Sequence, residues 1–382
     1  MSDDSDPLHL AVALDGTGWH PASWRAADAR PGDILTAGYW VDLVTEAERG
    51  QLDFVTFEDG LALQSDDPRR IDRRTDRVRG RLDAVLIASR VAPRTRHIGL
   101  VPTVVVTHTE PFHASKAIAT LDYVSKGRAG VRVQVTGSAA AAAHFGRRVI
   151  TEPGPDLTGE LLAEAADYVE VIRRLWDSWE DDAEIRDVAT GRFVDRKKLH
   201  YIDFEGETFT VKGPSITPRP PQGQPLVAAL AHGAPAYELV AQQADIGFVT
   251  PRGTTQTRAA VDALAERVRV FADLVVFLDE SPVAAATRKD RLDHLGGIEF
   301  SSDAEVFVGT PAQLADLLAD RRVDGLAGFR LRPATLPHDL LQITDGLLPE
   351  LRRRGLFGTG YDAPTLRGLL GLPRPANRYA AV

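Results

Sequence analysis

The chain contains no cysteine, which excludes disulfide bonds, thiolate nucleophiles and cysteine-bound metal ions. It also lacks any window of about 18 uninterrupted apolar residues, so the sequence predicts no membrane-spanning helix. Positive charge is not in excess, because Lys and Arg total 45 against 54 Asp and Glu, giving a net charge of -9. This balance disfavours nucleic acid as a partner.

Several signal and motif classes are missing as well. The start MSDDSDPLHL is acidic where a secretory signal would be basic and then apolar, so we expect a cytoplasmic protein. There is no Walker-type phosphate loop and no nucleophile elbow of the Gly-x-Ser-x-Gly type. Any chemistry must therefore use histidines, carboxylates, hydroxyls or a bound cofactor.

Short apolar runs of β-forming residues recur along the 382 residues. The eight runs are 8–14, 53–57, 97–106, 129–135, 226–230, 246–250, 268–278 and 325–331. Between several of them lie segments with helical apolar spacing, namely 34–49, 82–89, 112–123, 237–243 and 311–318. Strands that alternate with helices indicate parallel βαβ units, and eight units predict a closed (β/α)8 TIM barrel.

The chain is longer than the usual barrel of about 250 residues, so we predict one domain, 1–382, with long insertions. They are expected near 15–32, 60–81, 137–159, 177–224 and 280–307. Within the fourth, FEGETF predicts a β-hairpin. An open doubly wound sheet is the alternative, but the nearest dinucleotide fingerprint, which begins at Gly16, has Pro21 in place of its third glycine.

In such a barrel the site lies at the C-terminal ends of the strands, so the residues that follow each run are the candidates. These residues are Asp15, Gly16, His20, Glu58, Asp59, Thr103, Thr107, His108, Glu110, Thr136, Gly137, Ser138, His232, Gly233, Thr250 and Arg252. Hydroxyls, imidazoles and a few carboxylates beside apolar walls such as Phe57 and Phe248 favour a planar organic ligand.

Each candidate also has a purely structural interpretation. His20 and Asp59 are placed where a side chain often caps a loop or turn. Gly233 begins a helix whose free N–H groups would hold an anion, although a glycine there is also a common turn residue. His108 and His113 lie five residues apart, the wrong spacing for two ligands on one helical face, so we predict no metal site.

Several longer blocks carry a family resemblance. Among them are GTGWHPASWR (16–25), AERGQLDFVTFEDGLAL (47–63), RHIGLVPTVVVTHTEPFHASKAIATLDYVSKGRAG (96–130) and FEGETFTVKGPSITPRPPQGQP (204–225). With these blocks the chain resembles the bacterial luciferase-like flavin monooxygenases, specifically the nitrilotriacetate and dibenzothiophene-sulfone monooxygenase branch. The resemblance implies a barrel enzyme that works as a homodimer or tetramer.

The same resemblance implies a two-component system. A separate NAD(P)H-dependent reductase would supply reduced FMN, and oxygen would form a flavin C4a-hydroperoxide that oxygenates a small organic substrate. By position, Asp59 and Thr103 correspond to residues beside the flavin ring, and His20 corresponds to a signature histidine. Phe57 and Phe248 correspond to apolar walls of the substrate pocket. We expect His20 and His108 to be the catalytic histidines.

Other positions depart from the branch. Arg132 stands where it has a ring-proximal Asn, and Gly137 and Gly233 stand where it has serines on the phosphate. An Arg-Tyr pair on the phosphate is replaced by leucines at 161–162. We therefore expect an altered phosphate corner built from Arg132, Thr136, Gly137, His232 and Gly233. The departures leave two alternatives open, a changed cofactor such as a deazaflavin, or a barrel that has lost flavin and serves as a binding or structural subunit.

Overall fold

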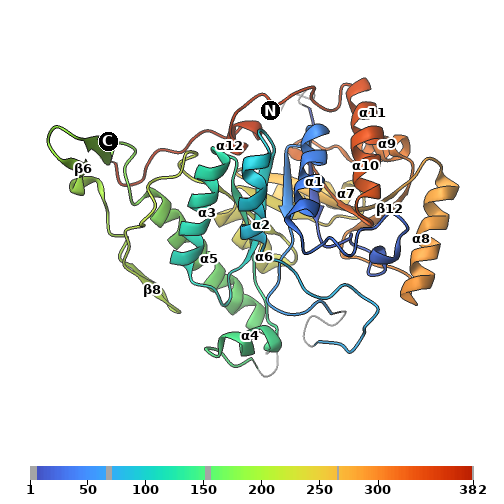
Figure 1. Cartoon of the computed structure of the whole chain (residues 1–382), viewed down its shortest axis with the longest axis horizontal. Coiled ribbons are helices and arrows are strands. Elements are labelled where there is room, and N and C mark those ends of the chain that lie inside the picture. The colour runs from blue at the N-terminus through green and yellow to red at the C-terminus, as the bar shows by residue number, and fades with distance from the viewer. Residues whose placement is uncertain (1–6, 66–70, 151–155, 265, 381–382) are drawn as a thin grey trace.

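The computed structural model describes residues 7–65, 71–150, 156–264 and 266–380 (Figure 1). Eight parallel strands close into a barrel, each hydrogen-bonded to the next in the order β1, β2, β3, β4, β9, β10, β11, β13 and back to β1. Their bounds are His9–Leu14, Phe54–Phe57, Gly99–Val105, Gly130–Gln134, Leu226–Leu230, Ile246–Val249, Arg269–Leu278 and Leu326–Pro333. Seven predicted runs contain one of these strands, and the eighth, 325–331, overlaps β13, which extends to Pro333. The predicted (β/α)8 barrel is therefore confirmed.

Helices surround the barrel. The helices on its outer face include α1 (Ala37–Arg49), α2 (Ala84–Val91), α3 (Pro111–Ser125), α5 (Leu157–Asp177), α6 (Ala234–Gln243), α7 (Thr254–Leu264), α9 (Pro311–Arg321), α10 (His338–Gln342) and α11 (Leu348–Arg353). None of the helices in the described ranges is long and apolar enough to cross a membrane.

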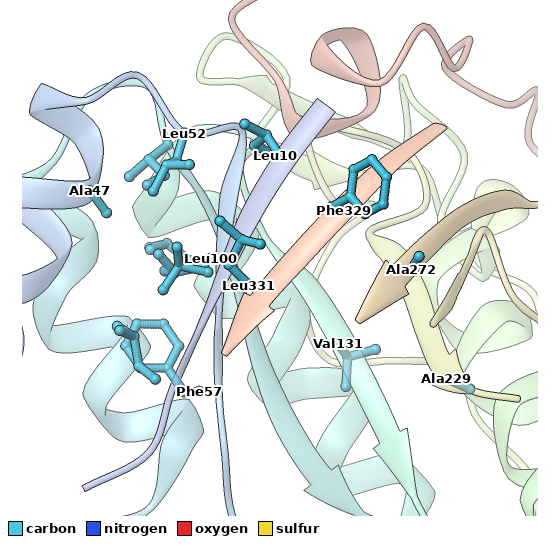
Figure 2. Close-up of a cluster of buried hydrophobic side chains, with 14 of the residues drawn as sticks. Leu10, Ala47, Leu52, Phe57, Leu100, Val131, Ala229, Ala272, Phe329 and Leu331 are labelled. Carbon is cyan, nitrogen blue, oxygen red and sulfur yellow. The ribbon is translucent and has the colours of Figure 1, made fainter. Parts of the chain in front are cut away.

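The strands are buried on both faces, as a barrel wrapped in helices requires. Figure 2 shows part of the outer layer, where Leu10 and Leu331 project from the strands toward Ala47 of α1 and Leu52. Inside the barrel an aromatic layer contains Phe54, Phe248 and Phe271. Alternate residues along each strand therefore serve two separate cores.

A short helix closes the N-terminal end of the barrel. In α12 (Leu366–Leu369), Leu366 joins the inner layer, and Leu370 follows it. Gly99 makes this approach possible, because a Cβ on that residue would lie 2.5 Å from Leu366 Cδ1. The opposite, C-terminal end of the barrel is left as the place for a site.

The predicted insertions carry regular structure that the sequence patterns partly missed. The expected hairpin is present as β7 (Phe204–Glu205) paired with β8 (Thr210–Val211), and β5 (Glu184–Asp187) pairs with β6 (Arg192–Val194) beside it (Figure 1). Region 137–159 contains α4 (Ala139–Phe145), with residues 151–155 outside the described ranges. Region 280–307 contains α8 (Pro282–Gly296) and the start of β12 (Glu305–Gly309). Strand β12 pairs with the C-terminal half of β11 and so adds a strand to the sheet there.

Candidate functional site

An ion pair lies where the C-terminal halves of β2, β3 and β4 meet. Arg132 of β4 donates from Nη1 to Glu58 Oε2 at 2.5 Å and to Thr103 Oγ1 at 3.0 Å. Thr103 and Arg132 are register partners in neighbouring strands, so barrel closure itself sets them side by side. Only 8% of the Arg132 side chain and 11% of the Glu58 side chain are exposed.

The network continues across the barrel interior. Arg330 donates to Asp273 from Nε at 2.8 Å and Nη2 at 2.5 Å, and its Nη1 lies 3.7 Å from Glu58 Oε1. Arg332 shares Asp273 and extends to Asp303 at 2.7 Å. The Arg330 guanidinium also lies 3.7 Å above the Phe248 ring, a cation–π contact. A layer of paired charges therefore covers the aromatic layer beneath it.

Neighbouring arginines determine the charge state of Glu58. Burial alone raises the pKa of Glu58, but the charges of Arg132, Arg330, Arg332 and Arg81 outweigh burial and hold that pKa below its usual value. Glu58 is therefore ionised at neutral pH. The same balance shows that cationic charge dominates around this carboxylate.

Asp59 is used by the backbone. Its Oδ1 accepts from the Gly60 N–H at 2.7 Å, and its Oδ2 accepts from the N–H of Ala84, the first residue of α2, at 2.9 Å. Burial, the main cause, raises the pKa of Asp59. The structure thus gives this residue a turn-forming and helix-anchoring role, and its contact with a flavin ring stays a prediction.

The two candidate catalytic histidines differ in their free nitrogens. His20 is 1% exposed, accepts from the Ala22 N–H through Nδ1, and donates from Nε2 to Asp293 of α8 at 3.0 Å. His108 is 9% exposed and stacks on Phe145 with ring centroids 5.3 Å apart. Its Nε2 is buried and has no hydrogen-bond partner within the described residues. His20 is therefore occupied on both ring nitrogens, whereas His108 keeps one available.

The predicted phosphate corner is divided in the structure. Thr136 is engaged locally, since its Oγ1 accepts from the Ser138 N–H at 3.3 Å. Gly137 faces apolar atoms, because a Cβ there would meet Leu157 at 3.4 Å and Leu161 at 3.8 Å. Arg132 is held inside the barrel by hydrogen bonds to Glu58 and Thr103, and neither bond involves a residue of this corner.

The other half of the corner lies at the start of α6. Gly233 is the N-cap residue with φ +82°, and no side chain caps the helix. His232 is exposed beside it, and both residues line a hollow with Tyr237, Thr250 and Gln256 at the ends of β9 and β10. Pro235 has no N–H, and the Ala236 N–H donates to Gly233 O. The N–H groups of Gly233 and Ala234 are therefore the ones left to face an anionic group.

The two predicted apolar wall residues lie in different layers. Phe57 projects outward with Leu100 and Leu331 and packs near Trp40, with ring centroids 6.3 Å apart (Figure 2). Phe248 is fully buried inside the barrel beneath Arg330. The contact of each of these two residues with a substrate stays a prediction.

Three charged members of the network were missed as site residues in the sequence. Asp273, Arg330 and Arg332 lie within runs that otherwise read as buried strands. Arg330 and Arg332 are two residues apart, so both point into the barrel. Charged residues at alternate positions of an otherwise apolar strand were the signal from which these site residues could have been predicted. In the described residues no three His, Asp or Glu side chains come together as a metal site.

Comparison with known proteins now identifies the family. The family model described as Luciferase-like monooxygenase matches residues 19–313. The chain belongs to the luciferase-like monooxygenase family. This membership confirms the resemblance seen in the sequence and the predicted enzyme class, a monooxygenase.

Two curated relatives align over almost the whole chain. The chain is 30% identical to N-acetyl-S-(2-succino)cysteine monooxygenase of Bacillus subtilis (strain 168), covering 100% of both chains. It is 29% identical to nitrilotriacetate monooxygenase component A of Aminobacter aminovorans, covering 98% of both. The first alignment spans 460 positions, more than the 382 residues here, so that relative carries segments that this chain lacks.

Solved structures agree in fold. A riboflavin lyase structure superposes with a TM-score of 0.84 at 24% identity, covering 98% of both chains. A long-chain alkane monooxygenase superposes with a TM-score of 0.82 at 24% identity, covering 96% of both. At this sequence identity the similarity concerns the fold alone, that is, the barrel and its insertions.

Proposed function

We propose that this chain is the oxygenating component of a two-component, reduced-flavin-dependent monooxygenase that acts on a small organic substrate. The observation that carries the proposal is the full-length match to nitrilotriacetate monooxygenase component A. A component name implies a partner, and we assign that role to a separate NAD(P)H-dependent flavin reductase. By the family resemblance, the enzyme would be a homodimer or tetramer.

The residues present fit a flavin, though differently from the pattern expected of the branch. The uncapped α6 start with Gly233, His232 and Thr250 would hold the FMN phosphate, because the N–H groups of Gly233 and Ala234 lie beside polar side chains there. Thr103 accepts from Arg132, so its own hydroxyl hydrogen is free for an oxygen of the ring. The corner at Gly137 would contribute shape alone, since its neighbours are leucines.

When bound, reduced flavin would supply the chemistry that activates dioxygen. The protein would orient the substrate and exclude water. His108 is the better acid or base of the two histidines because its Nε2 is unpartnered. Burial, with a smaller contribution from the charge of Arg148, lowers the pKa of His108, so the ring is neutral at pH 7 and able to accept a proton. His20 would instead fix the loop after β1 to α8.

A changed cofactor or a flavin-free subunit remains the second candidate. It is favoured by one observation, the leucine-lined corner at Gly137 where the branch has phosphate contacts. Two relatives are named as subunits A and B of pristinamycin IIA synthase, so the family contains proteins that act in subunit pairs. A deazaflavin with a different tail would suit the altered corner.

Anaerobic titration with photoreduced FMN, followed by tryptophan fluorescence, tests the proposal. Oxidised FMN and a deazaflavin are titrated in parallel. We expect reduced FMN to bind with micromolar affinity or better and to bind more tightly than oxidised FMN. Absence of reduced-FMN binding up to millimolar concentration would exclude the monooxygenase assignment, and tight deazaflavin binding in its place would establish the changed cofactor.

A further inference from the structure

One edge of the Arg132 guanidinium is unused. Its Nη1 is occupied by Glu58 and Thr103, whereas Nε is buried and has no hydrogen-bond partner. Nη2 makes no hydrogen bond within the described residues either. The side chain is nevertheless 8% exposed, so the group is not sealed away from the mouth of the barrel.

This free edge distinguishes Arg132 from every other buried arginine in the described chain. The Nε of each of the others donates to a carboxylate or a backbone carbonyl; these residues are Arg128, Arg219, Arg330, Arg332 and Arg367. Those five are fully used in holding the fold together. Among these six buried arginines, only Arg132 has an Nε–H without a hydrogen-bond partner.

The chemistry of the edge specifies what it binds. The Nε–H and one Nη2–H of a guanidinium are parallel and coplanar, which matches the two oxygens of a carboxylate. A second guanidinium lies close by, because Arg330 Nη1 is 3.7 Å from Glu58 Oε1. Glu58 holds Nη1, so it fixes the direction in which the free edge points.

The position of Arg132 separates this ligand from the cofactor phosphate. Arg132 precedes Thr136 by four residues, and extended backbone advances about 3.3 Å per residue, so the two Cα atoms lie about 13 Å apart. The uncapped start of α6 belongs to a different pair of strand ends. The ligand at Arg132 therefore lies toward the barrel axis, where a substrate would enter.

We propose that Arg132 is a specificity-determining residue that anchors a carboxylate of the substrate through its Nε and Nη2 edge, with Glu58 as the positioning residue. The inference rests on the proposed function, since it names the substrate class of that site. The names of the relatives do not select this class, because they include an alkane and a dimethyl sulfide monooxygenase as well as nitrilotriacetate monooxygenase. The carboxylate class is instead inferred from the unpaired Nε and Nη2 donors of Arg132.

The test uses the flavin-free, full-length protein with succinate as the carboxylate probe and succinamide as its neutral counterpart. Binding is measured by calorimetry and by thermal shift at constant ionic strength. We expect succinate to bind with millimolar affinity and succinamide at least 10-fold more weakly. Arg132→Asn should weaken succinate binding at least 10-fold. Arg132→Lys keeps the positive charge but loses the two parallel N–H donors, so its succinate affinity should lie between those of wild type and Arg132→Asn.

Arg94 supplies a matched control, because it is an exposed arginine just before the start of β3, at the opposite end of the barrel from the mouth. Arg94→Asn should leave succinate affinity unchanged. Circular dichroism confirms that each variant is folded. Equal binding of succinate and succinamide, absence of succinate binding up to 100 mM, or undiminished binding by Arg132→Asn would each overturn the proposal. Arg132-dependent binding of inorganic phosphate without succinate would reassign the edge to the cofactor.

The titration with reduced FMN stays separate from this test. A protein that binds succinate through Arg132 and fails to bind reduced FMN would keep the carboxylate anchor and lose the proposed function. The reverse result would keep the monooxygenase and remove the anchor.

Discussion

Removing the charge of Asp273 should destabilise the protein sharply. Asp273 is fully buried and accepts hydrogen bonds from both Arg330 and Arg332. Asp273→Asn keeps the size of the side chain but leaves two buried guanidinium groups short of a counter-charge. Breaking a buried ion pair by losing one partner costs about 3–5 kcal/mol.

That cost converts to a measurable shift in melting temperature. Unfolding entropy of about 2.1 cal/mol/K per residue, over 382 residues, gives roughly 0.8 kcal/mol per degree. Asp273→Asn should therefore lower Tm by about 4–6 °C in differential scanning calorimetry. Asp290→Asn, on an exposed position of α8, should change the free energy of unfolding by about 0.5 kcal/mol or less.

The pH dependence provides a second measurement of the same interaction. Burial alone raises the pKa of Asp273, but the charges of Arg330 and Arg332 outweigh it and lower the pKa. A depressed folded-state pKa gives stabilisation that is present above the unfolded value of about 3.9 and is lost as the pH falls through the folded value. The gap between wild type and Asp273→Asn should narrow in that acidic range. A Tm loss below about 1 °C, or a gap independent of pH, would refute the reasoning.

Three further predictions concern the candidate site. Glu58→Ala should cost at least about 2 kcal/mol in urea unfolding because it orphans Arg132, and adding Arg132→Asn should recover about 1 kcal/mol, whereas strictly additive losses would contradict the coupling. Gly137→Ser should stay within about 0.5 kcal/mol of wild type, while Gly233→Ser should lose about 1 kcal/mol because a side chain at φ +82° is strained; equal losses would count against this. Burial lowers the pKa of His20, so wild type should lose stability as the pH falls from 7.5 to 5.5, and His20→Gln should lose less; an identical loss would show that His20 does not titrate this way.

The barrel strands were predictable because each is a mostly apolar run, buried by the barrel interior on one face and by the helices on the other. The helix α8 was not, since only Ala285, Leu292 and Gly296 of its residues are buried and no apolar stripe marks it. The sequence predicted α8 only as part of the insertion 280–307. Strand β12, which begins in that insertion, was not predicted either.

The candidate site was predictable only in part. The ends of the strands located Glu58 and Thr103 at the mouth, because parallel strands share one C-terminal end. Arg132 was singled out by the family resemblance alone. Their pairing depends on register between β2, β3 and β4, which sequence spacing does not contain. The contacts of Arg132 with Glu58 and Thr103 could therefore not be predicted, and its place at a phosphate corner stays a prediction.

The closure of the barrel also has a consequence for synthesis in the cell. The first strand pairs with the final barrel strand, His9 beside Gly328, so the first strand waits for roughly 320 residues to be translated. At about 5–20 residues per second this delay lasts roughly 15 to 60 s. During that time one edge of β1 is an unpaired strand edge, which is prone to aggregate. Production of this protein should therefore depend on chaperone capacity and on slow growth at low temperature more than on codon choice near the start of the message.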